Sequence, residues 1–191
     1  MSEIALFPLN TLLFPGGLLP LRIFETRYVD MIGRCMREDD VFGVVLVRDG
    51  SDTDREVDTA PVGTSARIVD FQSLEDGLLG VLCHGQRRFR IRARTRRADG
   101  LNCAEVDWLE DPQGVPIPET FQPLVPLLRT ALAQLKTMSR FMTPDYEDAC
   151  WVAYRIAELL PLDRALMQRL LEIDDPIARL GMLAPLFDLH D

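Results

Sequence analysis

The pattern of hydrophobic and polar positions divides the sequence into a first part with strand-like segments and a second part with helical spacing. Short apolar runs bounded by Pro, Gly or charged residues are typical of β-strands. They predict strands at 4–7, 18–24, 42–47, 62–71, 78–84, 86–97 and 103–109, the fifth and sixth being separated at Gly85. Segment 25–37 differs, because its apolar residues recur at i, i+3, i+4 and i+7, which predicts a helix.

The period of the pattern changes near residue 110. Segment 111–118 contains three prolines and one glycine, a composition typical of a linker. Beyond it the apolar residues keep helical spacing, and helix starts are predicted at three capping positions: Thr143, Asp163 and Asp175. We therefore predict an α+β fold with a β domain containing one helix at 1–110, a linker at 111–118 and an α-helical bundle at 119–191.

Composition and charge narrow the class of protein. The 47% hydrophobic and 27% charged residues are ordinary for a folded chain, and the net charge of −9 argues against a general nucleic-acid binder. The four cysteines form no CxxC pair, which indicates buried thiols in a reducing compartment. An acidic start and interrupting prolines argue against a secretory leader or a membrane span. We expect a cytoplasmic protein with no membrane contact.

A series of short motifs runs in order along nearly the whole chain. It includes Phe7-Pro8-Leu9, Leu13-Phe14-Pro15-Gly16-Gly17-Leu18-Leu19-Pro20-Leu21, Ile23-Phe24-Glu25, Phe42-Gly43-Val44-Val45, Val62-Gly63-Thr64, Arg88-Phe89-Arg90-Ile91, Leu159-Leu160-Pro161-Leu162 and Asp174-Asp175-Pro176. In this order the motifs resemble the LON N-terminal domain, the substrate-recognition part of ATP-dependent Lon proteases. The resemblance implies a PUA-like β pseudo-barrel followed by α-helices, and a role in capturing polypeptide substrates and assembling the protease.

The catalytic parts of such a protease have no counterpart in the sequence. A phosphate-binding loop of the form GxxxxGK[ST] needs a lysine, and Lys136 is the only lysine present. A Ser-Lys dyad needs a lysine as its base, but Lys136 and nearby Ser139 lie on a predicted helix outside any matching motif. We therefore expect a stand-alone LON-domain protein that lacks the ATPase and protease modules and has no catalytic residues and no cofactor.

The segment Phe14-Pro15-Gly16-Gly17-Leu18 is the first candidate for a binding surface. Gly16 and Gly17 give its backbone freedom, and apolar side chains flank them. We predict a partly exposed apolar groove with the site residues Phe14, Gly16, Gly17 and Leu18, which accepts unfolded or hydrophobic polypeptide segments or a partner protein. In the competing interpretation, Phe14 and Leu18 belong to the core. The sequence also leaves room for a homo-oligomer.

An arginine-rich strand is the second candidate. Segment 86–97 contains seven arginines and no acidic residue. Strand alternation places Arg88, Arg90, Arg92, Arg94 and Arg96 on one face, which suggests RNA or anionic-ligand binding as an alternative function. We favour a solvated face with ion pairs instead, because the chain is acidic and no aromatic residue interleaves there to stack on bases.

Cysteine and histidine offer a third kind of chemistry. Cys83 and His84 are both ligand types for zinc, yet no further ligand follows at a motif spacing. We interpret Cys83 as a core thiol next to a partly exposed histidine, and we predict no metal site. An enzyme with an unrecognised site is left as a third hypothesis, which only a pocket with converging titratable groups would support.

Overall fold

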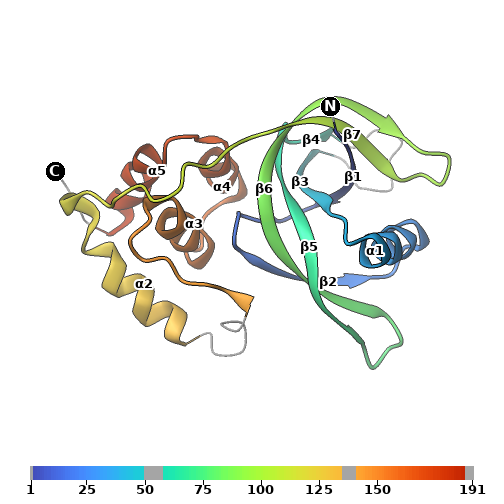
Figure 1. The fold of residues 1–191 in the computed structure, drawn as a ribbon, viewed down its shortest axis with the longest axis horizontal. Helices are drawn as coiled ribbons and strands as arrows, with labels where there is room; N and C mark the ends of the chain where they lie inside the picture. Colours follow the sequence, from blue (N-terminus) through green and yellow to red (C-terminus); the bar gives the residue numbers. More distant parts are fainter. Residues whose placement is uncertain (1, 50–57, 135–140, 188–191) are drawn as a thin grey trace. The chain divides into compact units, whose positions relative to one another are not determined.

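The computed structural model describes residues 2–49, 58–134 and 141–187 and forms two compact units, Met1–Leu109 and Glu110–Asp191 (Figure 1). The strands and helix α1 lie in the first unit, and the other helices lie in the second. Positions Lys136 and Ser139, and the predicted helical residues around them, lie outside the described residues.

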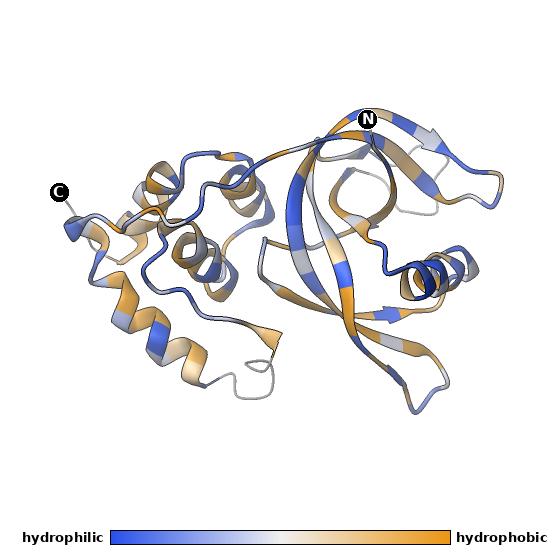
Figure 2. Ribbon diagram, viewed as in Figure 1, coloured by the Kyte–Doolittle hydropathy of each residue, from blue (hydrophilic) through white to orange (hydrophobic). Residues whose placement is uncertain are grey.

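A mostly antiparallel sheet dominates the first unit. Its strands are β1 Ser2–Leu9, β2 Leu18–Ile23, β3 Phe42–Asp49, β4 Asp58–Thr59, β5 Val62–Ser73, β6 Leu79–Arg96 and β7 Asn102–Trp108. The strand order is β1-β7-β6-β5-β3-β4, and β1 also pairs in parallel with β3, so the path returns to its first strand. Strand β2 pairs with the first part of β6. Hydrophobic and hydrophilic residues are interspersed along the long strands β5 and β6 (Figure 2).

The prediction of two strands separated at Gly85 is wrong, because β6 runs unbroken from Leu79 to Arg96. Gly85 lies inside this strand, where the loop before β2 crosses it. A Cβ atom at Gly85 would lie 2.2 Å from the carbonyl oxygen of Phe14. The glycine is therefore needed for a close approach between two backbones, and it does not end the strand.

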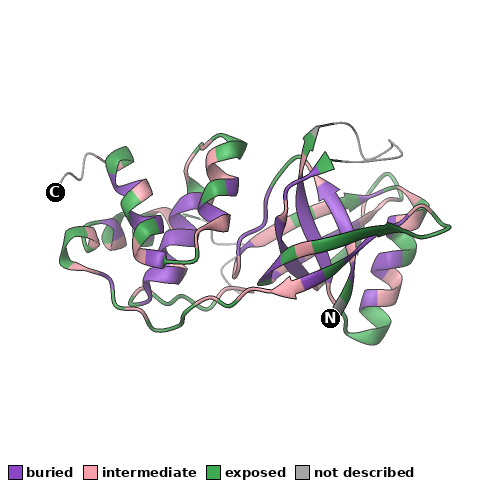
Figure 3. Ribbon diagram, turned by 90° about the horizontal axis from the view of Figure 1, so that it is seen from above, coloured by how far each residue is buried: buried purple, intermediate pink, exposed green. Residues whose placement is uncertain are grey.

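Helix α1 (Thr26–Glu38) buries one side against the sheet, as its spacing predicts. The buried residues are Tyr28, Met31, Ile32 and Cys35, and they join a cluster that includes Phe7, Ile23, Val81 and Cys83. A second cluster surrounds the fully buried Phe89, whose ring occupies the space that Cβ atoms at Gly43 and Gly63 would fill. Buried residues accordingly line the strands and one side of α1 (Figure 3).

The second unit consists of helices. They are the 3-10 helix η1 Glu119–Phe121, α2 Leu124–Ala133, α3 Ala149–Leu159, α4 Arg164–Glu172, α5 Pro176–Leu183 and the 3-10 helix η3 Ala184–Phe187. The predicted caps Asp163 and Asp175 are confirmed, since their side chains accept bonds from the N–H groups of Leu166 and Ile177. The predicted cap Thr143 is wrong: α3 starts later, at Ala149, and its N-cap is Asp148. The Asp148 carboxylate accepts from two N–H groups of the helix and also from the Val115 N–H at 3.1 Å.

A buried arginine connects the helices of this unit. Arg179 is fully buried, donates from Nε to the carbonyl oxygen of Leu170 at 3.0 Å and lies 3.9 Å above the ring of Tyr154. The Tyr154 hydroxyl in turn donates to Asp111 at 2.7 Å, in the segment before the first helix. The start of the second unit is thus tied to α3 by a hydrogen bond, and to α5 by an ion pair of 3.9 Å between Asp111 and Arg179.

Candidate functional site

The predicted groove at Phe14–Leu18 is closed. Phe14 is 0% exposed, Gly17 is buried, and Gly16 and Leu18 are half-buried. The Gly16 N–H donates to the carbonyl oxygen of Gly85 at 2.8 Å, and the Gly85 N–H donates to that of Gly17 at 2.9 Å. Gly16 has a φ of 72°, which favours glycine there. The expectation of an exposed Phe14 is therefore wrong, because this turn fixes the loop to β6 and places the ring in the core.

The arginine-rich strand does not present one continuous basic face. Arg88 is fully buried, so its placement on a solvated face with Arg90 is wrong. The pairing of β6 with β7 shifts between Ile91 and Ala93, which interrupts the regular alternation. Arg92 pairs with Asp107, and Arg94 donates to the backbone and hydroxyl oxygens of Thr59 at 3.0 Å. RNA or anion binding through this strand is therefore not favoured.

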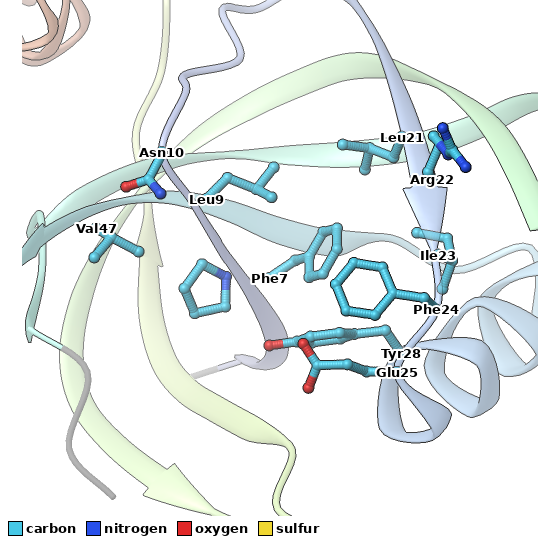
Figure 4. A pocket seen from close by; sticks show the side chains of 11 residues that line it. Phe7, Leu9, Asn10, Leu21, Arg22, Ile23, Phe24, Glu25, Tyr28 and Val47 are labelled. Atoms are coloured by element: carbon cyan, nitrogen blue, oxygen red, sulfur yellow. The ribbon is translucent and has the colours of Figure 1, made fainter. Parts of the chain in front are cut away.

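A pocket of about 270 Å³ lies in the first unit, between the ends of β1 and β2 and the start of α1 (Figure 4). Most of its lining is apolar. The lining residues are Phe7, Pro8, Leu9, Asn10, Leu21, Arg22, Ile23, Phe24, Glu25, Tyr28 and Val47. All of them lie in the first unit, so the pocket belongs to one compact body.

Aromatic rings form the middle of this pocket. The ring centroids of Phe7 and Tyr28 are 4.2 Å apart at an interplanar angle of 64°. Phe24 extends beside them (Figure 4) and is 70% exposed, whereas the preceding Ile23 is 2% exposed. β2 ends at Ile23 and α1 begins at Thr26, so Phe24 lies in the short connection between them. The exposed ring and the mainly apolar pocket beside it together form an apolar surface that a ligand could cover.

Charged side chains lie at the rim. The Glu25 carboxylate accepts a hydrogen bond from Arg27 Nε at 3.0 Å and forms an ion pair with Arg27 Nη2 at 2.8 Å, both through the oxygen Oε2. Arg27 also donates from Nη1 to the carbonyl oxygen of Gly100 at 3.0 Å and lies 4.8 Å from the centre of the Tyr28 ring. Arg22, on the other side, pairs with Asp76. The rim is therefore polar but largely paired.

The cysteines offer no reactive thiol. All four are free and buried. Burial raises the pKa of the Cys83 thiol to about 12 and those of Cys35 and Cys150 to about 11. These thiols are therefore protonated near neutral pH, and the thiolate needed for nucleophilic chemistry is scarce.

The described ranges contain neither a cluster of metal ligands nor a membrane-spanning helix. Between residues 2 and 187, outside the two undescribed stretches, no three His, Cys, Asp or Glu side chains gather in a way that would hold a metal ion. Within the same ranges, no helix is both long enough and apolar enough to cross a membrane.

Sequence reasoning missed Phe24 as a site residue, although a signal was present. Ile23 and Phe24 are adjacent apolar residues at the end of a predicted strand. Successive side chains of a strand point to opposite faces, so only one of the two is expected to enter the core. Because both residues are apolar, the sequence pattern did not show which of the two enters the core.

Comparison with known proteins places the chain in a family. The chain belongs to the ATP-dependent protease La (LON) substrate-binding domains, which it matches over residues 3–187, as the motif series predicts. A crystal structure of a Lon N-terminal domain protein from Xanthomonas campestris is 35% identical, with a TM-score of 0.81 and coverage of 97% of this chain and 98% of that chain. The N-terminal domain of Mycobacterium avium complex Lon protease shares the fold at 18% identity, with a TM-score of 0.68 and full coverage of both chains.

Curated relatives are much longer than this chain. Lon protease of Escherichia coli strain K12 is 28% identical over 198 residues, which cover 97% of this chain and 24% of the relative. Lon protease 2 of Myxococcus xanthus is 34% identical over 103 residues, which cover 53% of this chain and 12% of the relative. The matched region in this chain is thus the substrate-binding domain, and the chain spans about a quarter or less of these relatives.

Proposed function

We propose that this chain is a non-catalytic polypeptide-binding module, and that the pocket beside Phe24 accepts apolar side chains of unfolded protein segments. One observation carries the proposal: Phe24 is 70% exposed at a mainly apolar pocket in a domain of a substrate-binding family. A ligand that covers the Phe24 ring and fills the pocket beside it removes apolar surface from water, which favours binding.

The size of the pocket agrees with a side chain as its ligand. Sites for small molecules and cofactors have volumes of about 300–1,000 Å³. At about 270 Å³ this pocket lies just below that range and is open to solvent along Phe24. Burying one large apolar side chain contributes about 1.5–3 kcal/mol. A single anchored residue therefore gives weak and reversible binding, which suits a module that samples many unfolded segments.

A binding assay with a matched pair of variants tests the proposal. The probe is a fluorescein-labelled, reduced and carboxymethylated unfolded protein, and fluorescence anisotropy measures its binding to the purified chain. Phe24→Ser is expected to weaken binding about tenfold or more, because it removes the exposed ring from the pocket.

The control is Phe71→Ser. Phe71 on β5 is also strongly exposed, at 60%, but does not line the pocket. If both substitutions weaken binding equally, exposed aromatic residues in general are responsible, and the pocket proposal fails. If the unmodified chain does not bind the probe, the polypeptide-binding proposal itself fails.

We also infer the finer architecture from the same observations. The closed path through β1, β7, β6, β5 and β3 supports a PUA-like pseudo-barrel. Packing of α3 against both α2 and α5 supports a helical bundle at 119–191, joined to the β domain at 1–110 through 111–118. Four free, buried cysteines support a reducing, cytoplasmic compartment. A partner protein or a second copy is a further candidate for the exposed surface at Phe24.

A further inference from the structure

We propose that the pocket recognises the N-terminal residue of a polypeptide, with a large apolar side chain in the pocket and the α-ammonium group at the Glu25 carboxylate. This inference rests on the proposed function, because it names the kind of segment that the same pocket takes. It follows from the unusual position of Glu25 and from the way its carboxylate is held.

Glu25 occupies the N-cap position of α1 without capping the helix. Ser, Thr, Asp and Asn are preferred at this position because their short side chains bond the first free N–H groups of a helix. The Glu25 side chain makes no such bond. Instead it lines the pocket, with 29% of the side chain exposed, and its carboxylate lies beside the ring of Tyr28 (Figure 4). The acid is therefore available to a ligand in the pocket.

Arg27 fixes this carboxylate but engages one of its oxygens. The hydrogen bond and the ion pair from Arg27 both involve Oε2. Arg27 is itself immobilised, since its side chain is 9% exposed and its Nη1 donates to Gly100. Within residues 2–49, 58–134 and 141–187, no other group hydrogen-bonds to the Glu25 side chain, so Oε1 is an open acceptor. The Glu25 carboxylate therefore presents Oε1, an acceptor whose position Arg27 fixes, at the rim of an apolar pocket.

The position of this acceptor favours a donor close to the anchoring side chain. Glu25 and the aromatic rings line the same pocket, so the donor is expected to be attached to the Cα of the residue that fills it. An internal residue offers one neutral amide N–H there. An N-terminal residue offers an ammonium group, which has three donors and carries a positive charge that strengthens its hydrogen bond to a carboxylate. A lysine or arginine carries its charge at the end of a flexible stem and fits this geometry less well.

The nearby positive charge of Arg22 does not cancel this preference. Arg22 also lines the pocket, but its guanidinium pairs with Asp76, which offsets its charge. Arg27 offsets the charge of Glu25 in the same way, so the preference for an ammonium group over a carboxylate rests on the open acceptor Oε1, to which a carboxylate has no proton to donate.

Two peptides that differ only at their N-terminus test the inference. Both begin with phenylalanine, continue with alanine, serine and glycine, and end in a fluorescein-labelled lysine, and one of them is N-acetylated. Anisotropy at pH 6.5 and low salt is expected to show about tenfold tighter binding of the free peptide, from one charge-assisted bond. Glu25→Gln is expected to abolish the difference in affinity between the free and the acetylated peptide.

A pH series makes the same test without any substitution. The α-amino group has a pKa of about 7.7–8.0, so its charge is lost as the pH rises to 9. The advantage of the free peptide is expected to disappear over this range, while the affinity of the acetylated peptide stays constant. This measurement is independent of any effect that Glu25→Gln has on folding.

The outcomes separate the two proposals. Equal binding of both peptides at pH 6.5, lost in Phe24→Ser, overturns N-terminal recognition and leaves the pocket as a general site for apolar side chains. Binding of neither peptide at millimolar protein concentration, together with no binding of the unfolded protein, overturns both proposals.

Discussion

Phe14 and Phe24 belong to the same Pro- and Gly-rich stretch, yet their environments are opposite. Phe14 is 0% exposed and Phe24 is 70% exposed. Both have apolar neighbours in the sequence. The difference arises from what holds the backbone: hydrogen bonds to Gly85 fix the loop after Phe14 onto β6, whereas Phe24 lies between the end of β2 and the start of α1.

The two regions have a similar composition, but one stabilises the fold and the other forms an exposed surface. The loop at Phe14–Gly17 holds the first unit together, because it bridges into β6 where the strand passes Gly85. The connection at Phe24 contributes little to the core and leaves a ring free beside a pocket. Substitutions in the loop are therefore expected to change stability, and substitutions in the connection to change binding.

Phe14→Ala is expected to have the largest effect. Removing a fully buried aromatic side chain leaves a cavity and costs about 3–5 kcal/mol of unfolding free energy. Urea denaturation measures this cost through the fluorescence of Trp108, in a Trp151→Phe background that leaves the second unit silent. A loss below about 1 kcal/mol would show that the ring is not a core element. The fraction that stays folded is expected to bind the unfolded-protein probe normally.

Gly85→Ala tests the other side of the same contact. Its new Cβ would lie 2.2 Å from the Phe14 carbonyl oxygen, a backbone atom that cannot move without breaking the loop's bonds to β6. We expect a loss of about 1–3 kcal/mol by the same urea assay, as for other overpacked sites. Gly33→Ala is the matched control, since the nearest atom to its Cβ is the far end of the Arg37 side chain at 3.4 Å. It lies within α1 and is expected to be neutral or stabilising.

Local chemistry made most of the fold predictable. The apolar spacing of Tyr28, Met31, Ile32 and Cys35 specifies the buried side of α1, and the carboxylates of Asp163 and Asp175 specify two helix starts. These signals depend on residues close in sequence. The family resemblance, which rests on motifs in order, is confirmed as well.

The errors share a physical cause, which is contact between residues far apart in sequence. Gly85 resembles a strand break until the loop at Phe14 is placed across it. Asp148 caps the helix in place of Thr143, and its carboxylate also accepts from Val115, which is distant in sequence. Arg88 is buried although its strand alternation suggests a solvated face. The candidate pocket was not predictable for the same reason, because its walls come from β1, β2, β3 and α1.

Phe24→Ser is expected to have the smallest effect on stability, and it sharpens the comparison most. A side chain that is 70% exposed has little packing to lose, so the unfolding free energy is expected to change by no more than about 0.5 kcal/mol. The urea assay that detects Phe14→Ala measures this change, with Phe71→Ser as a control of similar exposure on β5. Binding of the unfolded-protein probe is expected to fall in Phe24→Ser alone.

A destabilisation of about 2 kcal/mol in Phe24→Ser but not in Phe71→Ser would show instead that Phe24 covers the Phe7 and Tyr28 rings as part of the core. In that case Phe24 would stabilise the fold by packing on the aromatic rings, and it would differ from Phe14 only in the size of its contribution to the free energy of unfolding.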